Sequence, residues 1–296
     1  DRSKLSGAAG AAFDKWKASS GTIETSIPAG GRWDLVIDGL FGIGLQRALE
    51  GRHAELVQTI NSLRLPVLSL DIPSGINADT GAVMGHAVRA ARTVTFIGLK
   101  PGLLTLDGPD QCGELHTDTL GLDTETLLPP QGRLLDDNVL PQALAQRPRN
   151  FHKGLAGTAV ILGGAAGMVG AAVLAGRAAL KCGAGRVHLA LLTEHPPSID
   201  YGQPELMLRT PDGVFRSTEM TVLAAGPGMG KDESAKRALR RALETPSTLL
   251  LDADALNLVG EEPELAELTA TRQAATLLTP HPAEAGRLLG LSTREV

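Results

Sequence analysis

Two aspartates and a serine in the first half of the chain carry side chains that could bind a cation or move a proton. Asp38 ends an apolar run at 34–38, and Asp71 follows a second run at 66–70, with Ser74 close behind. Carboxylate and hydroxyl oxygens are ligands for hard cations, and a carboxylate beside a substrate can transfer a proton. Aspartate is also common as a cap of turns, and for either aspartate alone this role is favoured. Their occurrence at two neighbouring strand ends favours a site.

The second half contains a comparable set of residues. The run at 222–225 leads into Gly-Pro-Gly-Met-Gly at 226–230, whose backbone could approach a phosphate or a ribose. Later strand ends supply hydrogen-bond donors and acceptors that we expect to face one crevice: Asp252, Asp254, Asn257 and His281. His281 lies between two prolines and could equally be a loop histidine bonded to the backbone, so both interpretations stay open.

The stretch at 150–185 reads as a strand, a glycine turn and a helix. A β-branched run at 158–162 is followed by glycines at 163, 164, 167 and 170 and then by a helix of small residues. A helix N-terminus behind such a turn can bind an anion, so the stretch could hold a phosphate. For the stretch taken alone, a tight turn with glycines that only allow close helix packing is favoured.

These residues require a scaffold of alternating strands and helices. Periodicity predicts helices at 8–17 and 236–243, and a further helix with apolar residues at 56, 60 and 63. It predicts strands at 34–38, 66–70, 93–97, 158–162, 186–192, 204–208, 222–225, 248–251 and 275–278. This alternation is typical of parallel sheets with helices on both faces, where ligands bind at the carboxyl ends of the strands. Lys100 follows the run at 93–97 and is expected at the same edge. Periodicity is lost between 124 and 149, which predicts domains at 1–130 and 150–296 joined by a connection at 131–149.

Composition excludes several classes of protein. The 296 residues are 43% hydrophobic with a formal net charge of -5 and no block of like charges, so neither nucleic acid nor an anionic membrane is expected as a partner. No apolar run is long enough for a membrane span, and the first twenty residues do not resemble a signal peptide. Two cysteines without metal-ligand spacing favour a reducing compartment, and we expect a cytoplasmic protein.

In order and spacing, the motifs resemble those of bifunctional NAD(P)H-hydrate repair enzymes, in which an epimerase is fused to an ADP- or ATP-dependent dehydratase. The resemblance extends over most of the chain, at 34–45, 69–75, 95–102, 152–185, 226–230, 251–257 and 279–290. It implies an α/β fold with a Rossmann-like three-layer domain followed by a ribokinase-like domain. The implied substrates are NADH and NADPH hydrated at C6 of the nicotinamide, in both epimeric forms. A potassium ion, ADP or ATP with magnesium, and a homo-oligomer are implied as well.

The resemblance also implies roles for individual residues. Asp38 and Ser74 match potassium ligands, and Asp71 matches a substrate-contacting carboxylate that we expect to transfer the proton in epimerisation. In the dehydratase domain, Ala171, Gly230 and His281 match positions that bind the hydrate; there the nucleotide is expected to phosphorylate the C6 hydroxyl before elimination. The loop expected to contact the hydrate in the epimerase domain consists of Gly42, Ile43, Gly44, Leu45, Gln46, Arg47 and Ala48.

Two motifs of the family are missing from this sequence. The motif Gly-x-Gly-x-Asn-Gly-Gly-Asp-Gly, which supplies a further potassium ligand, is expected before residue 34, and Gly-x-Gly-Asp, with the catalytic aspartate of the dehydratase, after residue 296. We therefore expect an internal piece of a longer protein, weak or inactive as a dehydratase on its own. Two alternatives stay open: a ribokinase-like small-molecule kinase, which leaves 34–102 without a role, and a non-catalytic nucleotide-binding fragment.

Overall fold

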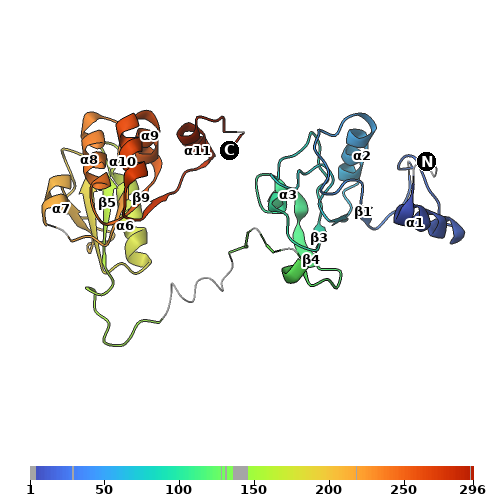
Figure 1. Ribbon diagram of the computed structural model, residues 1–296, viewed down its shortest axis with the longest axis horizontal. Helices are drawn as coiled ribbons and strands as arrows, with labels where there is room; N and C mark the ends of the chain where they lie inside the picture. Colours follow the sequence, from blue (N-terminus) through green and yellow to red (C-terminus); the bar gives the residue numbers. More distant parts are fainter. Residues whose placement is uncertain are drawn as a thin grey trace. The chain divides into compact units, whose positions relative to one another are not determined.

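The chain folds into two compact units, Asp1–Asn138 and Val139–Val296, here called unit 1 and unit 2. A computed structural model describes residues 5–28, 30–127, 129–130, 132–135, 146–217, 219–293 and 295–296 (Figure 1). Residues 131 and 136–145 of the connection predicted at 131–149 lie outside the described residues.

Unit 1 is built on a parallel sheet of four strands in the order β1-β2-β3-β4. The strands are β1 (Val36–Asp38), β2 (Val67–Leu70), β3 (Arg92–Phe96) and β4 (Glu114–Asp118). The described helices are α1 (Gly7–Ala18), α2 (Gly51–Ser62), the 3-10 helix η2 (Pro101–Leu103), α3 (Gly108–Cys112) and α4 (Thr124–Leu127). Because all four strands run in the same direction, their carboxyl ends meet at one edge of the sheet.

One face of this sheet is buried and carries an unusual stripe of polar residues. Helix α2 packs on it through Val57 and Ile60, which contact the same cluster as Val67 of β2. On the same face, Asp38 pairs in register with Ser69, and Ser69 with Thr93. Asp38 is 1% exposed and the two hydroxyl residues are fully buried. Such a stripe must satisfy its hydrogen bonds internally, since water does not reach it.

The opposite face of the unit 1 sheet is largely exposed, and its β1 and β2 side chains are apolar. Ile37 of β1 is 61% exposed and Leu70 of β2 is 37% exposed. Within the described part of unit 1, α2 and the short α3 both contribute to clusters on the polar-striped face, which also receives Val67 and Leu115.

Unit 2 is built on a parallel sheet of six strands in the order β10-β9-β8-β5-β6-β7. The strands are β5 (Thr158–Gly163), β6 (Arg186–Leu191), β7 (Met207–Arg209), β8 (Val222–Ala225), β9 (Thr248–Leu251) and β10 (Thr276–Leu278). The helices are α6 (Val169–Lys181), α7 (Pro211–Ser217), α8 (Glu233–Leu243), α9 (Ala253–Glu261), α10 (Pro263–Thr271) and α11 (Pro282–Leu289). The chain leaves β5 toward β6 and β7 and returns to β8 on the other side of β5. This reversal places a topological switch point between β5 and β8, where open α/β sheets bind ligands.

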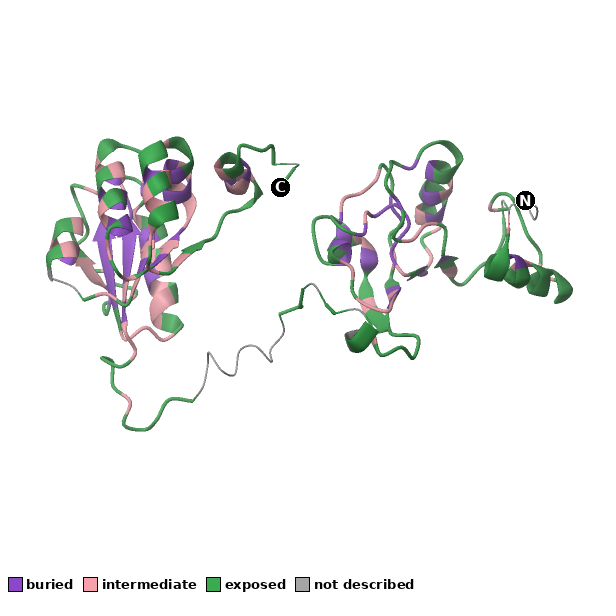
Figure 2. Ribbon diagram, in the orientation of Figure 1, coloured by how far each residue is buried: buried purple, intermediate pink, exposed green. Residues whose placement is uncertain are grey.

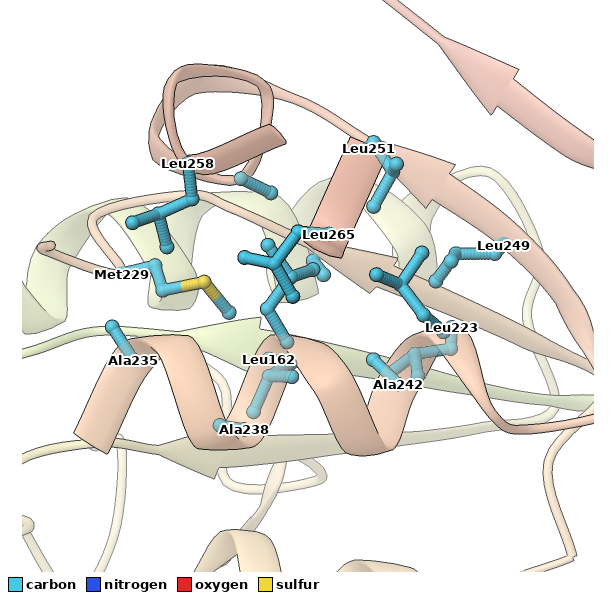
Figure 3. Close-up of a cluster of buried hydrophobic side chains, with 14 of the residues drawn as sticks. Leu162, Leu223, Met229, Ala235, Ala238, Ala242, Leu249, Leu251, Leu258 and Leu265 are labelled. Atoms are coloured by element: carbon cyan, nitrogen blue, oxygen red, sulfur yellow. The ribbon is translucent and has the colours of Figure 1, made fainter. Parts of the chain in front are cut away.

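Both faces of the unit 2 sheet are covered, and its strands are the most deeply buried part of the unit (Figure 2). In β5, Val160 and Leu162 contribute to the cluster under α8, α9 and α10, whereas Ile161 belongs to the cluster under α6. The alanines of α8 face this core, as does Met229 from the loop after β8 (Figure 3). Strands with such continuous apolar runs are expected in a parallel sheet buried on both sides.

The predicted α/β class with parallel sheets is confirmed. Predicted and observed strands agree closely except that the one expected at 204–208 begins only at Met207, and that β4 was missed. The sequence of β4, Glu-Leu-His-Thr-Asp, is polar because four of its five side chains are exposed, all except Leu115. Helix α8 begins before the predicted 236, because the side chain of Asp232 caps it by accepting a hydrogen bond from Ala235 N (2.8 Å). None of the described helices combines the length and apolarity that a membrane span requires.

Candidate functional site

Asp38, at the carboxyl end of β1, is a buried carboxylate held by four hydrogen bonds. Its Oδ1 accepts from Ser74 Oγ (2.6 Å) and from Leu40 N (3.3 Å), and its Oδ2 accepts from Ser69 Oγ (2.9 Å) and from Ser74 N (2.9 Å). Among the described residues no cationic side chain pairs with it. A buried charge is stabilised by hydrogen-bond donors of this kind. Asp38 therefore ties β1 to β2 and to the turn that contains Ser74.

The oxygen atoms around Ser74 form part of a shell that suits a hard cation. Ser74 Oγ lies 2.6 Å from Asp38 Oδ1 and 3.3 Å from the carbonyl oxygen of Phe41, and it accepts a hydrogen bond from Phe41 N (2.9 Å). Carboxylate, hydroxyl and carbonyl oxygens are the ligands that alkali and alkaline-earth ions prefer. Within the described residues there is no cluster of three or more His, Cys, Asp and Glu side chains that could hold a metal ion. The donor set thus fits an oxygen-bound cation and not a transition metal.

Asp71, just past the end of β2, lies at the same edge in a different environment. Its side chain is 22% exposed and forms an ion pair through Oδ1 with Lys100, whose side chain is 17% exposed. Oδ1 also accepts from Phe96 N (3.2 Å) and Thr95 Oγ1 (3.4 Å). A Cβ built on Gly42 would lie 3.6 Å from Asp71 Oδ2, so this oxygen faces the loop that follows β1.

The loop predicted to contact a hydrate is fixed by two apolar anchors and exposes most of its other residues. Leu45 and Leu49 are 7% and 6% exposed and pack in the cluster of α2. Leu49 N donates to Met84 O (2.8 Å), and Asn77 Nδ2 to Leu45 O (3.5 Å). Between and before these anchors the exposed residues are Ile43, Gly44, Gln46, Arg47 and Ala48, while Gly42 is half-buried. The loop therefore presents a surface beside Asp71 that is available to a ligand.

At the switch point of unit 2 the candidate site is made mostly of backbone. Gly164 N donates to Pro227 O (3.0 Å) and Ala165 N to Gly228 O (2.7 Å), so the loops after β5 and β8 are joined to each other. Gly226 has φ of 129°, and a Cβ there would lie 1.7 Å from the carbonyl oxygen of Asp252. Only glycine allows this approach.

Two of the three residues predicted to bind the hydrate in unit 2 lie close together. A Cβ on Gly228 would be 3.1 Å from Ala171 Cβ and 2.6 Å from Met168 O, and a Cβ on Gly230 would be 3.8 Å from Met168 Cε. Ala171, in the first turn of α6, and Gly230 therefore flank Met168, which is 40% exposed. Met229, which lies between Gly228 and Gly230 in the sequence, is fully buried and anchors the loop in the core (Figure 3).

The acidic and amide side chains predicted to face the crevice are engaged in holding segments together. Asp252 Oδ1 accepts from Thr279 Oγ1 (2.9 Å), and Asp254 Oδ2 accepts from Gly230 N (2.9 Å). Asn257 Oδ1 accepts from Arg287 Nε (2.9 Å), which links α9 to α11. Each has a structural role, and only Asp254 acts on a residue of the candidate site.

His281, the third of these predicted residues, is the N-cap of α11 and follows β10. Its Nδ1 accepts from Ala283 N (3.1 Å) and Glu284 N (3.4 Å), and Glu284 Oε2 accepts from His281 N (3.0 Å). Glu284 Oε1 lies 3.3 Å from Nε2. The interpretation as a backbone-bonded histidine therefore describes its contacts. Its side chain is 60% exposed, and its hydrogen bonds within the described residues do not bring it to Ala171 or Gly230.

Three residues of the unit 1 site were not assigned by sequence reasoning: Ser69, Thr95 and Lys100. Ser69 and Thr95 are fully buried in strands where an apolar side chain is expected. A hydroxyl residue facing the same side as Asp38 in such a strand is the signal that could have identified them. Lys100 was placed at the correct edge, but its sequence position did not reveal its pairing with Asp71.

Comparison with known proteins assigns both units. Residues 159–295 match the family model described as NAD(P)H-hydrate dehydratase, and residues 1–102 match the one described as YjeF-related protein N-terminus. A bifunctional NAD(P)H-hydrate repair enzyme of Coxiella burnetii is 40% identical over 302 residues, which cover 100% of this chain and 60% of that protein. The Escherichia coli enzyme of the same description is 38% identical over 271 residues, covering 89% of this chain and 50% of that protein.

The chain thus spans about 60% or less of the length of these two relatives. Among solved structures, the ADP/ATP-dependent NAD(P)H-hydrate dehydratase of Bacillus subtilis, co-crystallised with ATP and Mg²⁺, is 30% identical, with a TM-score of 0.41 over 51% of this chain and 53% of that chain. Both family models match in the expected order, and the whole chain aligns with bifunctional relatives. The chain belongs to the family of bifunctional NAD(P)H-hydrate repair enzymes.

Proposed function

We propose that unit 1 interconverts the two C6 epimers of hydrated NADH and NADPH. The observation that carries the proposal is the half-buried Asp71 carboxylate, whose Oδ2 faces the exposed loop at 42–48 while Oδ1 is held by three donors. A carboxylate with one oxygen fixed and the other open can accept a proton from a bound substrate and return it. The match of residues 1–102 to the YjeF-related model and the names of the relatives support this assignment.

A potassium ion fits the oxygen atoms around Ser74 in this proposal. Asp38, Ser74 and the Phe41 carbonyl would supply ligands, and the ion would compensate the buried Asp38 charge. Such an ion supplies positive charge close to the loop at 42–48, and so favours binding of the anionic dinucleotide.

For unit 2 we propose nucleotide-dependent dehydration of the hydrate at the switch point between β5 and β8. Ala171, Gly230 and His281 are proposed to contact the hydrate, with ADP or ATP and magnesium as the phosphoryl source. Once phosphorylated, the C6 oxygen leaves as phosphate, a proton leaves C5, and the C5–C6 double bond of the dihydronicotinamide is restored. The match of residues 159–295 to the dehydratase model and the clustered glycine loops support this proposal.

The remaining parts of the proposal concern organisation. Domain limits of 1–130 and 150–296 with a connection at 131–149 are proposed, and the division of the chain between residues 138 and 139 supports two domains. A homo-oligomer in the cytoplasm is proposed from the family resemblance and from the cysteine usage.

Replacing Asp71 tests the epimerase assignment. Asp71→Asn preserves the shape of the side chain but removes the base, so exchange between the epimers should fall about 1000-fold. Exchange is measured by chromatography of the two hydrate epimers after mixing one purified epimer with the protein.

Asp79→Asn is the matched control, because Asp79 is an exposed turn residue of the same unit. Its exchange rate should equal that of the parent. Full activity of Asp71→Asn would remove Asp71 from the mechanism, and a parent protein without any exchange would contradict the epimerase assignment itself.

A further inference from the structure

Lys100 uses every hydrogen of its ammonium group inside the unit 1 site. It donates to Asp71 Oδ1, to Thr95 Oγ1 (2.8 Å) and to the carbonyl oxygen of Phe96 (2.7 Å). An ammonium group has three donors, so none is left for a ligand. With its side chain only 17% exposed, Lys100 is a fixed internal cation and not a surface lysine that could reach a substrate phosphate.

The two oxygens of Asp71 are treated differently by their surroundings. Oδ1 accepts from Lys100 Nζ, Phe96 N and Thr95 Oγ1, whereas no described residue donates a hydrogen bond to Oδ2. Oδ2 is also the oxygen that faces Gly42. The carboxylate is therefore fixed in one orientation, with its open oxygen on the side of the loop at 42–48.

The chain ends the two neighbouring strands with the same strained turn, one for each partner of this ion pair. Ile72 N donates to Leu70 O (3.0 Å) around Asp71, and Gly98 N donates to Phe96 O (2.8 Å) around Ile97. The central residues have φ of 71° and 69°. This is the γ-turn with positive φ, which is rare, and it is especially unfavourable for a β-branched residue such as Ile97.

The paired turns have a common geometrical result. The first turns the Asp71 side chain across the end of β2 toward β3, and the second directs the chain after β3 back so that Lys100 reaches Asp71 and Thr95. Strained backbone of this kind persists only where surrounding contacts hold it, and it gathers at functional sites.

We propose that Lys100 is the positioning residue of the epimerase site: it holds Asp71 Oδ1, and so aims Oδ2 at the substrate loop. The inference rests on the proposed epimerase function of unit 1. Lys100 acts through Asp71 and does not touch the substrate. An ion pair with a merely structural role would not require that one carboxylate oxygen accept all three hydrogen bonds while the other accepts none from the described residues.

The first test separates substrate binding from turnover in epimer exchange. Lys100→Met keeps the length of the side chain but removes the charge, and should lower kcat about 100-fold while KM changes less than threefold, because a misaimed catalytic group affects the chemical step. Lys100→Arg keeps a cation beside Asp71 and should recover at least a tenth of the parent rate. The control is Arg92→Met, which removes an exposed ion pair between β3 and β4 (Arg92 and Glu114, side chains 70% and 69% exposed) and should change neither constant.

A double-mutant cycle tests whether Lys100 acts through Asp71. In the Asp71→Asn background, Lys100→Met should lower exchange no further, since the group that it positions is already absent. Two independent, multiplying losses would overturn the proposal, as would an unchanged kcat in Lys100→Met alone. If Lys100→Met does not fold, Lys100→Gln, which is uncharged and retains two N–H donors, replaces it in the cycle.

Crystal structures of the parent and of Lys100→Met provide a readout that does not need activity. Asp71 should keep its side-chain orientation in the parent and in Lys100→Arg, and lose it in Lys100→Met. An unchanged Asp71 in Lys100→Met would overturn the positioning role even if the protein proved to have no epimerase activity. If the parent protein shows no exchange but Asp71 still changes orientation in Lys100→Met, the proposed function is contradicted and the positioning role of Lys100 is supported.

Discussion

The two units gather their candidate sites at the same kind of place by different means. Both use the carboxyl edge of a parallel sheet, but unit 1 builds its site from charged side chains and unit 2 from glycine backbone. In unit 1, Asp38 and Asp71 lie at the ends of consecutive strands of a sheet without a reversal in strand order. In unit 2, the loops after β5 and β8 meet at a switch point and bond to each other through their main chains.

This difference determines what each site can tolerate. A side-chain site depends on the burial and pairing of individual carboxylates, whereas a backbone site depends on the absence of Cβ atoms at a few positions. Single carboxylates should therefore matter more in unit 1, and single glycines more in unit 2.

The largest effect is expected from a methyl group at Gly226. Gly226→Ala places a Cβ 1.7 Å from Asp252 O at a φ of 129°, so the loops after β8 and β9 must separate. Unit 2 should lose more than about 4 kcal/mol of unfolding free energy. Hydrogen exchange measured by mass spectrometry reports this loss for unit 2 separately from unit 1.

Gly170→Ala is the matched control in the same unit. Gly170 lies in the first turn of α6 with no atom within 4 Å of a built Cβ, so alanine should stabilise the helix by up to about 1 kcal/mol. If both alanine variants had similar stability, the stability of unit 2 would not depend on the absence of a Cβ atom at Gly226.

A smaller effect is expected from removing the buried carboxylate of unit 1. Asp38→Ala leaves the hydroxyls of Ser69 and Ser74 and two backbone N–H groups without their acceptor, which should cost unit 1 about 3 kcal/mol. Urea unfolding followed by tryptophan fluorescence suits this test, because Trp16 and Trp33, the two tryptophans of the chain, belong to unit 1.

The equivalent substitution in unit 2 should be milder. Within the described residues the Asp254 side chain accepts one hydrogen bond, from Gly230 N (2.9 Å), so Asp254→Ala should cost about 1 kcal/mol, measured by hydrogen exchange of unit 2. A loss in unit 2 as large as that caused by Asp38→Ala in unit 1 would mean that unit 2 depends on its carboxylates as much as unit 1 does.

The smallest effect concerns a histidine outside both sites. His188 of β6 is 8% exposed, its Nδ1 has no hydrogen-bond partner among the described residues, and burial, followed by the charges of Arg209 and Arg186, lowers its pKa. The unfolded chain therefore binds this proton more readily than the folded one. Unit 2 should lose stability as the pH falls from about 6.5, the ordinary value of histidine, toward the lowered pKa of His188.

His188→Leu should remove this acid sensitivity and stabilise unit 2 by about 1 kcal/mol at pH 7, because it eliminates a buried unpaired nitrogen. Unfolding at pH 7.5 and pH 5.5, monitored by hydrogen exchange of unit 2, compares the variant with the parent. An equal pH dependence in both proteins would assign the effect to other groups.

Much of the fold could be predicted from the sequence because apolar runs, and the glycine or aspartate residues that end them, are local signals. Residues 222–225 and 248–251 were predicted with the bounds that the strands have, since continuous apolar residues followed by glycine or aspartate leave little choice. The strand β4 escaped because its exposed face gives it a polar sequence. The parallel arrangement followed from the alternation of strands and helices.

Parts of the candidate sites could not be predicted because they depend on pairing between distant segments. Lys100 is 29 residues from Asp71, and no local pattern states that the two meet. Likewise, the hydrogen bond from Gly230 N to Asp254 depends on how α9 packs after β9. Residue type and strand end identify which groups reach the edge of a sheet, but the distribution of hydrogen bonds among them is a tertiary property.

The positive φ of Ile97 lowers the stability of unit 1, but the same turn places Lys100 beside Asp71 for the proposed activity. A glycine at this position would adopt the same φ without steric cost. Selection of heat-resistant variants from a mutant library would therefore favour Ile97→Gly, while loosening the segment that delivers Lys100 to Asp71. Variants selected for stability should therefore keep residue 97 constant and gain stability elsewhere, for instance at His188.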